Sequence, residues 1–145
     1  MDASTLPPAH PSIRMVGGFH ELLTTPFAGG VNALCWPRVL TGNFAEVVSL
    51  LGTGEGFVSL DEEILRGLPL SEAGRVAVEV MLADQRLLLE QDLEPELNLI
   101  HAYLRDEGAG PIATDVFSFH ADSATAETDP WLCTYHGAPS EGVLN

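Results

Sequence analysis

One long amphipathic segment, from Ser71 to about Gln91, constrains the fold of this chain more than any other feature of the sequence. Ser71 is a suitable N-cap, and apolar residues follow it at the three- and four-residue spacing of a helix face. The predicted core face comprises Ala73, Val76, Val80, Ala83 and Leu87, widened by Met81 and Leu88. We therefore expect a helix of about five turns that packs against a core.

The other predicted elements are shorter. Helices are expected at Phe19–Leu23 and Phe44–Leu51, the second with Asn43 as N-cap and Gly52 after its end. Alternating or apolar runs predict strands at 31–37, 97–104 (a helix is the alternative here), 115–122 and 131–135. Because helices come mainly first and strands last, we expect an α+β protein, with N-terminal helices packed on an antiparallel sheet.

The domain organisation follows from the same pattern. Residues 1–18 contain Pro7, Pro8 and Pro11 and are expected to be a flexible leader. Residues 19–145 are long enough for a single domain with one core. Within it we expect a helical part over about 19–94 and a β-rich part over about 95–145.

The charge of the chain excludes several partners. The sequence has 21 acidic residues against six arginines and no lysine, which gives a formal net charge of −15. A field of that sign repels nucleic acid and anionic membrane surfaces, so we expect neither as a partner and expect a small-molecule substrate instead. No apolar run reaches the roughly 20 residues of a membrane span, and the N-terminus lacks a signal-peptide pattern. These features indicate a cytoplasmic protein, in which Cys35 and Cys133 are expected to be buried, unlinked thiols.

The candidate site is the pair His120 and Asp122, at the end of the predicted strand 115–122. Side chains two apart on a strand point to the same face, so the two groups would lie side by side. An imidazole and a carboxylate supply two ligands of the 2-His-1-carboxylate site that holds Fe(II) in non-haem oxygenases. His136 could complete that set, could donate a hydrogen bond to a ligand, or could be an ordinary histidine at a strand end. The alternative for the pair is a surface aspartate beside a half-buried histidine.

The residues from about 115 to 145 resemble an uncharacterised bacterial domain family. The similarity rests on Phe119-His120-x-Asp122 and on the run Leu132-Cys133-Thr134-Tyr135-x-Gly137. That family looks related to the Fe(II)/2-oxoglutarate-dependent dioxygenases, whose fold is a double-stranded β-helix, or jelly roll. The resemblance implies that His120 and Asp122 are iron ligands, that 2-oxoglutarate is the co-substrate, and that Ser118, Thr134 and Tyr135 supply hydroxyls to the pocket.

The chain also departs from this superfamily. The distal histidine and the basic residue that pairs with 2-oxoglutarate are expected beyond Asn145, so the chain would be a fragment or a minimal form with a partial jelly roll. An open sheet edge is then expected, and a homodimer is one way to cover it. Two other functions fit the residues: a non-catalytic β-barrel module that binds a small ligand or partner, and a cupin-like metalloenzyme without 2-oxoglutarate.

Overall fold

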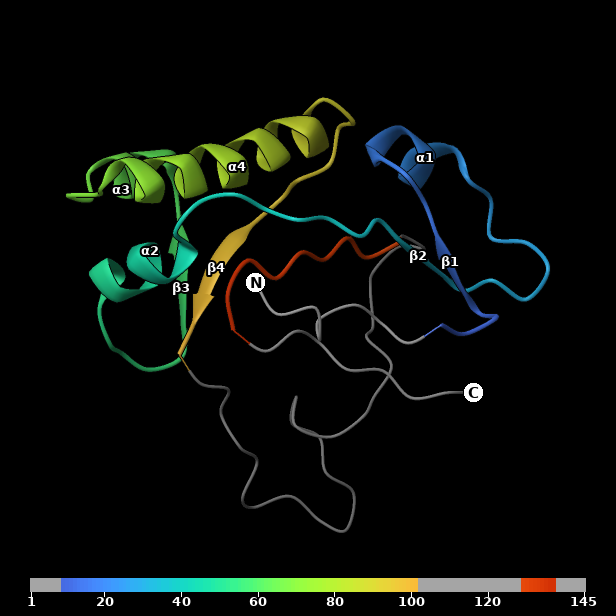
Figure 1. The fold of residues 1–145 in the computed structure, drawn as a ribbon, viewed down its shortest axis with the longest axis horizontal. Coiled ribbons are helices and arrows are strands. Elements are labelled where there is room, and N and C mark those ends of the chain that lie inside the picture. The colour runs from blue at the N-terminus through green and yellow to red at the C-terminus, as the bar shows by residue number, and fades with distance from the viewer. Residues whose placement is uncertain (1–8, 102–128, 138–145) are drawn as a thin grey trace, which may run out of the picture. The chain divides into compact units, whose positions relative to one another are not determined.

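The computed structural model describes residues 9–101 and 129–137 of the chain (Figure 1). The chain divides into two compact units, residues 1–40 and residues 41–145. The boundary therefore falls after Leu40, whereas the sequence pattern predicted it after Gly18. Helices and strands are both present, so the α+β class is confirmed.

The first unit combines a small parallel sheet with one short helix. Its elements are β1 (Ile13–Met15), α1 (Phe19–Thr24) and β2 (Ala33–Cys35). Strands β1 and β2 pair in parallel, with Ile13 opposite Ala33 and Met15 opposite Cys35. The expected helix and the expected strand are both found, but β1 lies in the stretch predicted to be a loose leader. Strand β1 forms by pairing with β2, which begins eighteen residues after β1 ends, and the residues around β1 carry no local pattern that indicates this pairing.

The second unit contains most of the helices. Its elements are α2 (Phe44–Leu51), β3 (Phe57–Leu60), α3 (Glu62–Arg66), α4 (Glu72–Leu89) and β4 (Leu97–Ile100). Strands β3 and β4 form an antiparallel pair, and both α2 and α3 contact α4. Strand β3 lies in the part of the chain that was predicted to be mainly helical. The sequence pattern missed β3 and α3, because no element was assigned to the residues between Gly52 and Ser71.

Side-chain caps set where the helices of this unit begin. The Asn43 side chain accepts a hydrogen bond from the backbone N–H of Glu46 at the start of α2. Asp61 does the same for α3, and Ser71 does so for α4. Such caps satisfy backbone donors that have no partner inside the helix, so the two predicted caps, at Asn43 and Ser71, fix the starts of α2 and α4 as expected.

The buried face of α4 differs from the predicted one. Its buried residues are Gly74, Ala77, Val78, Met81 and Leu82. Of the predicted face only Met81 is among them, and Val76 is 39% exposed. The buried row has the same helical spacing, but it includes the small residues Gly74 and Ala77, where α2 and the residue Gly42 before it lie close to α4.

Two further predictions concern the described residues. Residues 131–135 form no strand, although their aromatic and β-branched composition predicted one. Cys133 is exposed, not buried as predicted, and no disulfide joins it to Cys35, both of which lie in the described part. The predicted strand 115–122 lies outside the described residues. Among the helices within the described ranges, none combines the length and apolarity needed to cross a membrane.

Candidate functional site

The second half of the predicted site lies on residues 129–137, a segment without regular structure that is fastened to helices α2 and α4. The ring of Tyr135 stacks on the ring of Phe44, with centroids 5.7 Å apart and an interplanar angle of 17°. The Tyr135 hydroxyl donates a hydrogen bond of 2.7 Å to Oδ2 of Asp84 on α4. The pKa of Tyr135 is raised well above its usual value, mainly by burial of the phenol and secondly by this hydrogen bond.

These contacts determine what the neighbouring predicted residues can do. Tyr135 is half-buried and already uses its proton on Asp84, while Thr134 and His136 on either side of it are exposed. Gly137 follows with a φ of 90°, a backbone conformation that glycine adopts readily and other residues rarely do. Tyr135 thus acts as an anchor, and the side chains of Thr134 and His136 are left accessible to a ligand.

The other predicted site residues, Ser118, His120 and Asp122, lie outside the described residues. Within the described residues, no three histidine, cysteine, aspartate or glutamate side chains gather closely enough to hold a metal ion. Whether His136 meets His120 and Asp122 therefore stays a prediction.

The helices that receive Tyr135 are held against one another by a second set of polar contacts. Glu46 on α2 accepts hydrogen bonds from the backbone N–H and the hydroxyl of Ser71, at 2.8 and 2.5 Å. Ser71 is the N-cap of α4, where the exposed N–H groups and the helix dipole favour a negative charge. The two hydrogen bonds hold the pKa of Glu46 below its usual value. One carboxylate of α2 therefore fixes the start of α4.

Close backbone packing accompanies this polar join. The N–H of Asn43 donates to the carbonyl of Ala73, at 2.8 Å. Gly42, just before it, has a φ of 122° and lies so near Ala77 that a Cβ at position 42 would sit 2.5 Å from the Ala77 nitrogen. Since Phe44 is the second residue after Gly42, this approach also fixes the ring on which Tyr135 stacks.

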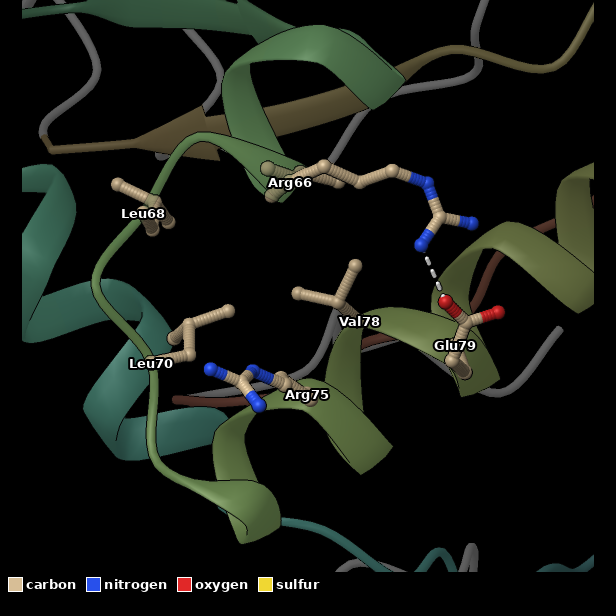
Figure 2. A pocket seen from close by; sticks show the side chains of 7 residues that line it. Arg66, Leu68, Leu70, Arg75, Val78 and Glu79 are labelled. Atoms are coloured by element: carbon tan, nitrogen blue, oxygen red, sulfur yellow. Dashed lines mark hydrogen bonds and ion pairs between the residues drawn. The ribbon is translucent and has the colours of Figure 1, made fainter.

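A separate hollow of about 220 Å³ lies between α3 and α4. Figure 2 shows it, lined by Leu65, Arg66, Leu68, Leu70, Arg75, Val78 and Glu79. Arg66 and Glu79 form an ion pair across its rim, and Arg66 also pairs with Glu62 at 2.7 Å. The sequence analysis did not single out these residues. One signal could have pointed to this hollow: Arg66 and Arg75, two of only six arginines in the chain, lie on either side of the Leu68-Pro69-Leu70 connection between the two helices.

The sequence analysis also missed the roles of Phe44 and Asp84. Phe44 was predicted only as the first residue of a helix, and Asp84 belongs to the polar part of the α4 pattern. Their partner is 91 and 51 residues further along the chain, so no spacing rule could have linked them to Tyr135.

Comparison of the chain with family models, with curated proteins and with solved structures finds no match in any of the three.

Proposed function

We propose that this chain is an oxygenase-like domain that binds Fe(II) through His120, Asp122 and His136 and uses 2-oxoglutarate to oxidise a small molecule. The observation that carries the proposal is the His120-x-Asp122 pair, followed by a segment in which Tyr135 is anchored and His136 is exposed. Two imidazoles and one carboxylate match the donor set of the facial-triad iron sites, so these residues fit the metal. The proposal includes a partial jelly roll over the β-rich part and a cytoplasmic location.

Each residue of the proposed site has its own role. His120, Asp122 and His136 would bind the metal on one face, and Ser118 and Thr134 would orient the 2-oxoglutarate carboxylates by hydrogen bonds. Tyr135 would hold the His136 segment in place through Asp84. When bound, Fe(II) and 2-oxoglutarate supply the oxidising chemistry.

Anaerobic titration of the protein with Fe(II), with and without 2-oxoglutarate, tests this function. We expect a visible charge-transfer band only when both are present, lost in His120→Ala and in Asp122→Ala. His20→Ala is the matched control, because His20 is an exposed histidine of α1 in the other unit. The His136→Ala variant decides whether His136 is the third ligand: loss of the band supports that role, and an unchanged band removes it.

Two results would replace this function by one of the alternatives. Metal binding that 2-oxoglutarate does not tighten would indicate a cupin-like metalloenzyme. Absence of binding in the native protein would contradict an iron site and favour a non-catalytic module that binds a small ligand. The specific observation that favours such a module is the hollow between α3 and α4, which combines an apolar floor with a guanidinium group.

The proposal also includes a homodimer, with a sheet edge of the partial jelly roll covered by a second copy. Sedimentation equilibrium over a range of concentrations tests it. A single species of 15.5 kDa at all concentrations would contradict the dimer.

A further inference from the structure

The hollow between α3 and α4 has a rigid apolar floor. Leu65, Leu70 and Val78 are 0%, 7% and 2% exposed, so the protein already holds them in place. The connection before α4 is fixed at both ends, because the Leu70 N–H donates to the carbonyl of Leu68 at 2.8 Å and Ser71 caps the helix. A ligand would therefore meet a preformed surface and would not have to order it.

The rim of the hollow carries one guanidinium that has no partner within the described part of the chain. Arg66 is occupied, since it pairs with both Glu62 and Glu79. Glu79, one turn after Arg75 on α4, is also shared with Arg86, at 3.6 Å. No hydrogen bond or ion pair between described residues engages the Arg75 guanidinium, although Glu79 lies four residues away. Figure 2 shows Arg75 and Arg66 on opposite sides of the hollow, with Leu70 and Val78 between them.

The side chains that line the hollow carry one more positive than negative charge. Two guanidinium groups, on Arg66 and Arg75, line it together with one carboxylate, on Glu79, while Glu62, Glu63 and Glu72 lie on the same two helices outside the lining. The remainder of the protein is strongly acidic, with a formal net charge of −15. A multiply charged anion such as a phosphate ester would meet repulsion from that field and would find only one unpaired guanidinium. A single carboxylate matches one guanidinium in both charge and planar shape.

The size of the hollow limits the apolar part of the ligand. A cavity of about 150 Å³ lined by aliphatic side chains is large enough for benzene. The present hollow, of about 220 Å³, therefore has room for one small ring or a short alkyl chain, with a polar end at the rim. Small, strongly hydrated anions would leave the leucine and valine floor unused.

We propose that this hollow binds a small apolar monocarboxylate, with its carboxylate on Arg75 and its hydrocarbon part against Leu68 and the edge of Leu70. The inference does not depend on the proposed iron site, because the residues involved are all on α3, α4 and their connection. It assigns a ligand class to a surface that the oxygenase function does not use.

Titration of the ¹⁵N-labelled full chain with hexanoate, followed by backbone and arginine side-chain NMR signals, tests the proposal. We expect saturable shifts at the lining residues and at the Arg75 Nε–H, with a dissociation constant of about 1 mM. Hexan-1-ol has the same alkyl chain without the charge, and its affinity should be lower by a factor of about ten or more. Shifts centred elsewhere, or no saturation at about ten times that concentration, would overturn the assignment.

Two arginine variants on the same helix separate a specific contact from general attraction. Arg75→Gln should weaken hexanoate binding about tenfold and leave binding of hexan-1-ol unchanged. Arg86→Gln removes the same charge from an exposed position that does not line the hollow, and it should change hexanoate binding less than about twofold. Equal weakening by both variants would show that hexanoate senses only the local field, and the proposed contact would be wrong.

A floor variant tests the apolar half of the site. Leu68 is only half-buried, so Leu68→Ser should fold, which thermal unfolding checks directly. It should weaken hexanoate and hexan-1-ol alike, because both lose the same apolar contact. Unchanged binding of both compounds would place the hydrocarbon part outside this hollow and overturn the proposal.

Discussion

Replacing Gly42 by alanine tests how closely α2 must approach α4. The φ of Gly42 is 122°, which L side chains rarely adopt, and an added Cβ would lie 2.5 Å from the nitrogen and 2.7 Å from the Cα of Ala77. Both atoms belong to the backbone of α4 at a fully buried residue, so they cannot move aside as a flexible side chain would. The unfavourable backbone conformation costs about 1–3 kcal/mol, and overpacking costs about 1–3 kcal/mol. We therefore expect Gly42→Ala to reduce the free energy of unfolding by about 4 kcal/mol.

Gly52→Ala is the matched control. Gly52 also has a positive φ, of 83°, but a Cβ added there meets no atom within 4 Å. This variant carries the backbone cost alone, so its loss should be about 2 kcal/mol. The difference between the two variants measures the contact between Gly42 and Ala77.

Urea unfolding followed by far-UV circular dichroism gives both values. A loss of about 4 kcal/mol is a large part of the 5–15 kcal/mol that stabilises a typical domain. Gly42→Ala is therefore expected to unfold at a clearly lower urea concentration than Gly52→Ala, with both variants folded in the absence of urea. Equal losses in the two variants would refute the close approach of α2 and α4, and the position of Phe44 derived from it.

Three further variants test the polar contacts of the second unit. Tyr135→Phe keeps the ring on Phe44 but loses the hydrogen bond to Asp84, so we expect a loss of about 1.5 kcal/mol in urea unfolding, and a loss under about 0.5 kcal/mol would contradict the anchor. Because the pKa of Tyr135 is raised in the folded state, its contribution to folding stability is present below the ordinary tyrosine pKa of about 10 and is lost as the pH rises above that value. Over that range the stability of Tyr135→Phe should fall less than that of the native protein. The pKa of Glu46 is lowered in the folded state, so its contribution to stability is present above the usual value of 4.5 and is lost as the pH falls through the lower folded value. The thermal unfolding temperature of Glu46→Gln should therefore depend less on pH in that acidic range. An unchanged acid dependence would rule out the contact with Ser71. Ser71→Ala removes the N-cap of α4 and should cost about 1 kcal/mol, with a smaller acid dependence as well, and full stability in this variant would contradict the cap.

Local chemistry predicted the elements that carry their own signals. The helices Phe44–Leu51 and Glu72–Leu89 begin at the capping residues Asn43 and Ser71, as their sequences indicate. The strand Leu97–Ile100 follows its alternating pattern. In each case the residues that determine the element lie within it or directly beside it.

Non-local contacts decided what the sequence could not predict. Strand β1 exists through its pairing with β2, and α4 contacts both α2, which was predicted, and α3, which was not. Residues 131–135 have the composition of a strand, but Tyr135 is held by an aromatic ring and a carboxylate instead of a neighbouring strand. Within the predicted site, the side-chain chemistry of Thr134 and His136 suits ligand binding and can be read from the sequence. The role of Tyr135 as an anchor cannot, because its partners are distant in the chain.

The contact between Tyr135 and Asp84 also has a consequence for the order in which the protein assembles. It closes a stretch of 51 residues, about twice the 25 residues between Glu46 and Ser71, so it loses more chain entropy when it forms. We expect α2 and α4 to associate first and residues 129–137 to dock afterwards. Stopped-flow measurements on Tyr135→Phe should then show faster unfolding and an almost unchanged refolding rate. Among the described residues of this unit, the segment that carries His136 would then be the last to dock during folding and the first to detach during unfolding.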